Sequence, residues 1–243
     1  MDLVSFKKTI PIKIFILLLF CVSACSSNNK LNKNEADTKT FGHGRLSADA
    51  TKIVEVYNPQ TDRTWMDRNL GASRRAQSIN DEKAYGDLYQ WGRASDGHEN
   101  RESLTTLIKS SDSRPSHNLF IRTVEMSHNW LAIKSDSLWQ ATKSINNPCP
   151  SGFRLPTIEE WETERKTWKT NDGDGAFSSP LKLTEAGRRI YTSGSVQSVG
   201  TGGYYWSATV SNNNSKSLYF NESLSSISNN SRSYGFSVRC IKN

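Results

Sequence analysis

A run rich in serine and asparagine near the C-terminal end of the chain limits most strongly how the chain can fold. Residues 211–233 contain nine Ser and six Asn in 23 positions, the composition of a low-complexity linker. Four larger apolar residues are nevertheless spaced through the run, at Leu218, Phe220, Leu224 and Ile227. We therefore expect ordered backbone whose small polar side chains face outward and whose apolar side chains need a scaffold built elsewhere.

Short strand-like segments surround this run and predict an α+β fold. They are short runs with apolar or aromatic residues, separated by Gly, Ser, Asn or Pro, and lie at 52–57, 181–183, 189–191, 204–206 and 234–240. In the last of them the apolar positions alternate strictly, which predicts one buried face. We expect one compact α+β domain over residues 51–243, with long loops.

One helix is predicted at about 157–169. Thr157 can cap its N-terminus, and Glu160 can complete a capping box. The sequence Asn-Asp-Gly-Asp-Gly at 171–175 is expected to end this helix as a turn. The polar stretch 94–129 is expected to be a long surface excursion, and most of the seven tryptophans are expected in the core.

The first 24 residues are expected to be an export signal. Lys7 and Lys8 precede an apolar run at 15–22. With Ile14 this run spans about 13 Å as a helix, far less than the ~30 Å hydrocarbon core of a bilayer. It is therefore interpreted as a signal peptide and not as a membrane span.

The sequence Val-Ser-Ala-Cys at 22–25 resembles the lipobox of bacterial lipoproteins. The resemblance implies cleavage before Cys25 and its acylation, and two or more acyl chains anchor a protein stably. Because Ser26 and not Asp follows, we expect an outer-membrane location in the cell envelope. Residues 25–50 have few apolar positions and are expected to form a flexible tether. The alternative is an ordinary signal peptide with an incidental cysteine.

The net charge does not point to nucleic acid. The chain has 31 Lys+Arg and 24 Asp+Glu. The first 24 residues hold three lysines and one aspartate, which leaves 28 basic and 23 acidic residues in the exported part. This mild excess lacks the clustered basic stripe of a nucleic-acid-binding domain.

Two of the four cysteines remain once Cys21 and Cys25 are assigned to the leader and the lipid. In an exported protein the pair Cys149 and Cys240 is expected to form a disulfide. It would close about 90 residues and contribute about 4–5 kcal/mol in the chain-entropy model. Two buried free thiols are the alternative.

Five separated motifs resemble the Fibrobacter succinogenes major paralogous domain. They are TWMDRNLGAS (64–73), AYGDLYQWGR (84–93), NPCPSGFRLPTIEEWE (147–162), GGYYWSAT (202–209) and GFSVRC (235–240). The resemblance spans residues 51–243 and implies a C-type-lectin-like fold in a secreted or lipid-anchored surface protein.

Some relatives of that family resemble the variable targets of diversity-generating retroelements, in which a C-terminal cassette is rewritten at adenines. The resemblance implies a fixed scaffold at Tyr205, Trp206, Leu218, Phe220, Arg232 and Phe236. It implies changeable, ligand-contacting positions at Lys216, Ser217, Tyr219, Asn221, Ser226, Ser228, Asn230 and Tyr234. Trp206 could stack on a sugar beside Tyr205, and Tyr205 is also a candidate ligand contact.

Metal and catalytic motifs are missing from the sequence. The calcium-binding tripeptides of sugar-binding lectins do not occur, and Asp172 with Asp174 is only a fragment of a calcium loop. No two of the histidines have metal-ligand spacing, and no nucleophile elbow, P-loop or dinucleotide motif is found. We expect no cofactor, no metal and no enzymatic activity. An oxidase that uses a cysteine pair, as in one branch of the lectin-like superfamily, is the remote alternative.

The expected function is ligand binding at the cell surface, through a face built by residues 204–234. Ser and Asn supply adaptable hydrogen bonds and Tyr supplies rigid contact area, as in an antibody paratope. The expected partner is a surface protein or glycan, and the lipid anchor contacts the membrane. A structural or adhesive protein without a defined pocket is the alternative.

Replacing Cys25 tests the anchor directly. Cys25→Ser removes the thiol that would be acylated, so we expect the protein to leave the membrane fraction and to lose incorporation of labelled palmitate. A mutant that still partitions with membranes, together with a wild-type protein that takes up no palmitate, would contradict the lipoprotein interpretation.

Overall fold

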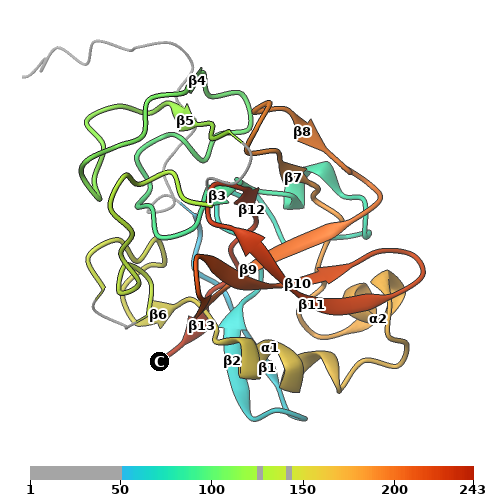
Figure 1. The fold of residues 1–243 in the computed structure, drawn as a ribbon. Coiled ribbons are helices and arrows are strands. Elements are labelled where there is room, and N and C mark those ends of the chain that lie inside the picture. Colours follow the sequence, from blue (N-terminus) through green and yellow to red (C-terminus); the bar gives the residue numbers. More distant parts are fainter. Residues whose placement is uncertain (1–50, 125–127, 141–143) are drawn as a thin grey trace, which may run out of the picture. The chain divides into compact units, whose positions relative to one another are not determined.

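The computed structural model describes residues 51–124, 128–140 and 144–243 (Figure 1). The predicted leader (1–24), the tether (25–50) and Cys25 lie outside the described residues. Among the helices of the described part, none is long and apolar enough to cross a membrane.

The described residues form short strands and few helices. The strands are β1 (Glu55–Asn58), β2 (Arg63–Met66), β3 (Tyr89–Gln90), β4 (Thr105–Thr106), β5 (Phe120–Ile121), β6 (Phe153–Arg154), β7 (Arg188–Arg189), β8 (Val196–Gln197), β9 (Gly203–Ser211), β10 (Asn214–Phe220), β11 (Ser225–Ser231), β12 (Gly235–Phe236) and β13 (Ile241–Lys242). The helices are the 3-10 turn Glu82–Ala84, α1 (Ile158–Arg165) and α2 (Gly173–Ser178).

The strands pair into four small sheets, with the orders β1-β2-β13-β6, β3-β12-β7-β8, β11-β10-β9 and β4-β5. Strand β13 lies between β2 and β6, because Ile241 pairs with both Trp65 and Arg154. The segments at the two ends of residues 51–243 are therefore held in one sheet. The predicted α+β class is confirmed.

The helix prediction is correct at its start and wrong at its end. Thr157 Oγ1 accepts the backbone N–H of Glu160, and a Glu160 carboxylate oxygen accepts that of Thr157, which completes the capping box. The helix ends at Arg165 and not near 169, because Thr167 and Trp168 donate to carbonyls three residues back. The predicted turn at 171–175 instead begins α2, where Asp172 accepts the N–H of Gly175.

Three other expectations need correction. Residues 181–183 form no strand, although Leu181 and Leu183 are buried. The segment 234–240 contributes only the short β12, and both its faces are buried, since Ser237 and Arg239 are as inaccessible as Val238. The stretch 94–129 is not wholly on the surface, because β5 is fully buried.

All seven tryptophans are buried, as predicted. Five of their indole N–H groups donate to a backbone carbonyl of another segment. Trp206, for example, donates to Tyr89 O at 2.7 Å, and Trp91 donates to Ser207 O at 2.9 Å. The rings thus fill the core and also fix the spacing of segments that pair only briefly as strands.

Asn69 connects its own motif to three others found in the sequence. Its amide oxygen accepts two hydrogen bonds from the guanidinium of Arg239, at 3.1 and 2.9 Å. Its amide nitrogen donates to Tyr85 O at 3.0 Å and to the hydroxyl of Tyr205 at 3.2 Å. Arg239 also donates to Leu181 O at 2.6 Å. Burial lowers the pKa of Arg239 to about 10, so this fully buried side chain stays charged at neutral pH.

The predicted disulfide is present. Cys149 and Cys240 are joined across a sequence separation of 91, and both are buried. The bond links the segment before α1 to the segment between β12 and β13.

Asn69→Ala should destabilise the domain strongly, because it removes the oxygen that accepts two hydrogen bonds from the buried, charged Arg239. We expect a loss of about 3–5 kcal/mol in the free energy of unfolding, measured by chemical denaturation. Asn229→Ala, at an exposed position of β11, is the matched control and should change stability by about 0.5 kcal/mol at most. Similar losses in the two variants would contradict the central role of Asn69.

Candidate functional site

The antiparallel sheet β11-β10-β9 presents two faces of different character. Successive side chains of a strand point to opposite faces, and Leu218 pairs with Tyr205 on β9 and with Ile227 on β11. These residues and Phe220 pack into a core cluster with Trp161 of α1. Figure 1 shows α1 next to β9 and β10. We call this side the helix face.

The opposite side, here named the polar face, carries small polar residues and tyrosines. It is formed by Ser217 and Tyr219 of β10 and by Ser226, Ser228 and Asn230 of β11. Ser217 pairs with Ser228, and Tyr219 pairs with Ser226. Tyr219, Ser226, Ser228 and Asn230 are half-exposed, whereas Ser217 is fully buried and accepts a hydrogen bond from Asn230 at 2.9 Å.

Four tyrosine rings cluster where the polar face meets β7 and β12. The ring centroids of Tyr204 and Tyr219 are 4.8 Å apart, and those of Tyr191 and Tyr234 are 4.6 Å apart. Phe236 lies 5.3 Å from both Tyr204 and Tyr234 and so connects the two pairs. This tyrosine cluster forms a preorganised aromatic surface beside the serines.

The cluster is brought together by backbone contacts between β7 and β9. Gly187 and Gly203 form a parallel bridge, with Gly187 N donating to Gly202 O at 2.9 Å. At Gly203 a Cβ atom would lie 2.2 Å from the Phe220 ring, so only glycine fits. The bridge between Gly187 and Gly203 brings Arg188 beside Tyr204, with the guanidinium carbon 4.8 Å from the ring centroid.

The hydroxyls of Tyr219 and Tyr234 remain protonated at neutral pH, because their pKa values are raised. Burial is the largest cause that raises the pKa of Tyr219, and the same holds for Tyr234. Protonated phenols both donate and accept hydrogen bonds. The polar face therefore offers hydroxyl and amide groups that can donate hydrogen bonds to a ligand or accept them from it.

The structure separates the predicted contact residues into two groups. Tyr219, Ser226, Ser228, Asn230 and Tyr234 lie on or beside the polar face and are half-exposed. The remaining four do not offer a free side chain there.

Tyr205 is wrong as a ligand contact, because its ring is fully buried on the helix face. Ser217 is also fully buried, and its hydroxyl is taken by Asn230. Lys216 alternates with Ser217 and so lies on the helix face. Asn221 follows β10. Its side-chain oxygen accepts the backbone N–H groups of Ser223 at 3.0 Å and of Leu224 at 2.9 Å in the next turn.

Three residues of the cluster were missed. Tyr204 could have been found, because alternation places it on the opposite face from Tyr205. Arg188 and Tyr191 could not, because β7 reaches the polar face only through its tertiary contact with β9.

Asp96, His98 and Glu99 lie close enough together to hold a metal ion, with ligand atoms within 4.8 Å of one another. His98 Nε2 accepts the backbone N–H of Gln90 at 3.0 Å, which assigns the ring proton to Nδ1. That nitrogen donates to Asp96 at 2.7 Å. Asp96 also binds Arg93 at 2.7 Å. The buried histidine thus has no free nitrogen for a metal, and the group is a hydrogen-bonded network.

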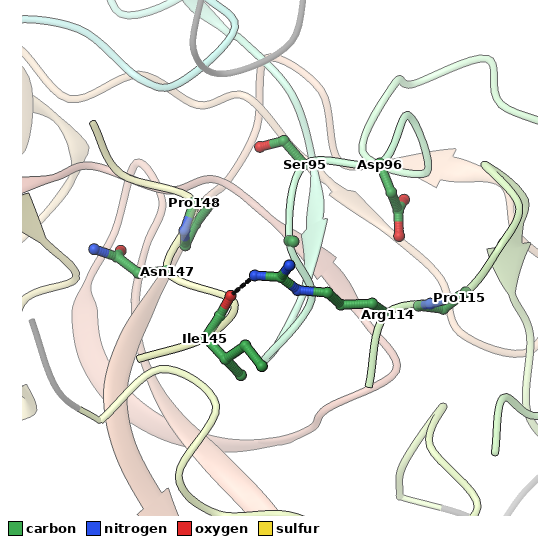
Figure 2. Close-up of a pocket in the computed structure, with 8 residues that line it drawn as sticks. Ser95, Asp96, Arg114, Pro115, Ile145, Asn147 and Pro148 are labelled. Atoms are coloured by element: carbon green, nitrogen blue, oxygen red, sulfur yellow. Dashed lines mark hydrogen bonds between the residues drawn. The ribbon is translucent and has the colours of Figure 1, made fainter. Parts of the chain in front are cut away.

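A cleft of about 350 Å³ lies between the loops around residues 94–96, 114–115 and 145–148 (Figure 2). Arg114 crosses it and donates to Ile145 O and to Asn146 Oδ1. Asp96 on the cleft wall is paired with Arg93. Both charged groups that line the cleft therefore already have partners within the domain.

The cysteine pair offers no reactive thiol, because Cys149 and Cys240 are joined to each other. The oxidase alternative requires reactive cysteines, so it has no support from the described geometry. Asp172 serves as the N-cap of α2 and Asp174 lies in its first turn. The calcium-loop fragment is thus part of a helix start.

One family model matches part of the chain. Residues 169–241 are similar to a domain of unknown function, DUF8237. The match begins before α2 and includes β7 to β12, and therefore the polar face and the tyrosine cluster. Neither a curated protein nor a solved structure matches the chain significantly.

The two faces should respond differently to substitution. Ser226→Ala with Ser228→Ala should change the free energy of unfolding by about 0.5 kcal/mol or less per site. Phe220→Ala should cost about 3–5 kcal/mol, because the ring is fully buried. Asn221→Ala should cost about 1 kcal/mol through the lost turn hydrogen bonds. Chemical denaturation measures all three, and a costly serine pair beside a silent Phe220→Ala would reverse the assignment of the faces.

Proposed function

We propose that this chain is a lipid-anchored protein of the bacterial cell envelope that binds a protein or glycan through the polar face. The observation that carries the proposal is that the two faces of β10 and β11 have different surroundings. Residues that hold the sheet to the core alternate with half-exposed Tyr, Ser and Asn residues on the other side. Such a surface can change its side chains without disturbing the scaffold.

The resemblance to the Fibrobacter succinogenes major paralogous domain extends this proposal to a C-type-lectin-like fold. The motif residues support it by their positions, since Asn69, Tyr205 and Arg239 from three different motifs meet in the core. The outer membrane is the proposed location, on the strength of the sequence at Cys25 and Ser26.

Retroelement diversification of the face is part of the proposal, and DNA sequence tests it. We expect a near-copy of the 3′ coding end downstream, differing at adenines, next to a reverse transcriptase gene. Among isolates, substitutions should fall at Tyr219, Ser226, Ser228 and Asn230 and should spare Leu218. A missing copy, or equal variation on both faces, would contradict diversification.

Binding is tested by selecting ligands for the immobilised full-length chain from a displayed library of random dodecapeptides and from a glycan array. Replacing Tyr219 by Ser and Ser228 by Gln together changes the polar face without adding charge. We expect this double variant to bind the selected ligands at least about tenfold more weakly, as for the loss of an interface tyrosine.

The matched control is Asn229→Gln, at the neighbouring residue of β11 whose side chain lies on the helix side. It should leave the affinity unchanged. Ligands that bind the double variant as well as the wild type would place the binding site elsewhere, and a selection without any ligand would favour a structural or adhesive role.

A further inference from the structure

Arg188 is the cation of the tyrosine cluster, and its guanidinium forms no ion pair with a described residue. The side chain also forms no hydrogen bond with any described residue, and its buried Nε has no acceptor there. The guanidinium carbon lies 4.8 Å from the ring centroid of Tyr204 and 5.6 Å from that of Tyr234. The side chain is thus held by two ring faces while its N–H groups remain unused.

The neighbouring Arg189 shows how this domain treats an arginine that serves the core. Its guanidinium donates to Gly194 O, Asn100 O and both the hydroxyl and the carbonyl of Ser103. All its nitrogens are satisfied within the protein. Arg188 directly precedes Arg189 on β7. Its side chain faces the other way and has none of these acceptors.

No carboxylate of the described residues forms an ion pair with Arg188. The charge on Arg188 lowers the pKa of both Tyr219 and Tyr234, partly opposing the effect of burial. No carboxylate is among the groups that influence either tyrosine. A half-buried, unpaired guanidinium among aromatic rings attracts an anion more strongly than an arginine in open solvent does.

We infer that Arg188 binds a carboxylate of the ligand, namely an aspartate or glutamate side chain of a protein partner. A guanidinium fork accommodates a carboxylate with two parallel hydrogen bonds, and the protonated hydroxyls of Tyr219 and Tyr234 lie in the same cluster. This inference rests on the proposed function of the polar face and names the chemistry that the face recognises.

A protein segment fits this site better than a sugar for two reasons. The rings of Tyr204 and Tyr234 already have Arg188 and Phe236 against them, so their faces are engaged. The polar face also continues along β10 and β11 with Ser and Asn, beside Tyr and Arg. Tyr and Arg are the residues enriched in the centres of protein interfaces.

The dodecapeptide library provides the test, with the full-length chain immobilised as before. Peptides selected by the wild type should be enriched in Asp or Glu. For a selected peptide, replacing its acidic residue by the matching amide should weaken binding by about 10- to 100-fold. Arg188→Gln should cause a similar loss, and the two changes combined should cost little more than either alone.

Two further variants separate charge, shape and folding. Arg188→Lys keeps the charge but not the planar fork, so it should retain only part of the affinity. Arg63→Gln replaces another arginine without a hydrogen-bond partner, exposed on β2 and outside the polar face, and should have no effect. The Arg188 side chain forms no hydrogen bond with a described residue, and Arg188→Gln removes only its contacts with the two rings. The unfolding midpoint should therefore fall only slightly, and the variant should remain folded in the assay.

The failure of this inference is distinguishable from failure of the proposed function. Some peptides could fail to bind the double variant at Tyr219 and Ser228 but bind Arg188→Gln with wild-type affinity. That result would overturn the carboxylate contact and leave the polar face as the binding site. Peptides indifferent to both variants would overturn both. Selective binding of polygalacturonate, lost in Arg188→Gln, would show a glycan carboxylate and overturn the protein partner.

Discussion

The contact between Asn69 and Arg239 is the interaction on which the rest of the domain depends. It brings a segment after β2 to a segment before β13 and holds a charge that is fully buried. The same amide reaches the hydroxyl of Tyr205 on β9. Since many strands here are two residues long, such side-chain hydrogen bonds and the indole N–H contacts, more than long β-ladders, fix how the segments pack.

Because Tyr205 and its neighbours anchor one side of the β9–β11 sheet, the other side is free to differ. The period of two along a strand puts Leu218 and Phe220 into the core and leaves Tyr219 on the polar face. A change at Ser226 or Ser228 therefore alters the half-exposed surface and little of what holds the sheet. This separation is what a protein needs if its ligand changes faster than its fold.

Two consecutive arginines on β7 show the same separation at the level of charge. Arg189 is saturated by carbonyls and a hydroxyl of the domain, so its charge serves folding. Among the described residues, the Arg188 side chain contacts only aromatic rings, so its N–H groups have no acceptor there. The Asp96–His98 network has no such capacity, since each of its polar atoms is already engaged.

The sequence by itself determined the α+β class, the start of α1, the buried tryptophans, the disulfide and the order within 211–233, because these follow from local periodicity, capping and cysteine count. It misplaced the end of α1, where hydrogen bonds three residues back replace the helix, and it took the start of α2 for a turn. Only the tertiary structure decided that Tyr205 and Ser217 are buried, through packing against other segments. The tertiary structure also brings Arg188 and Tyr191 to the polar face through the parallel bridge between Gly187 and Gly203, and a pairing between strands that is set by packing leaves no pattern in either strand alone.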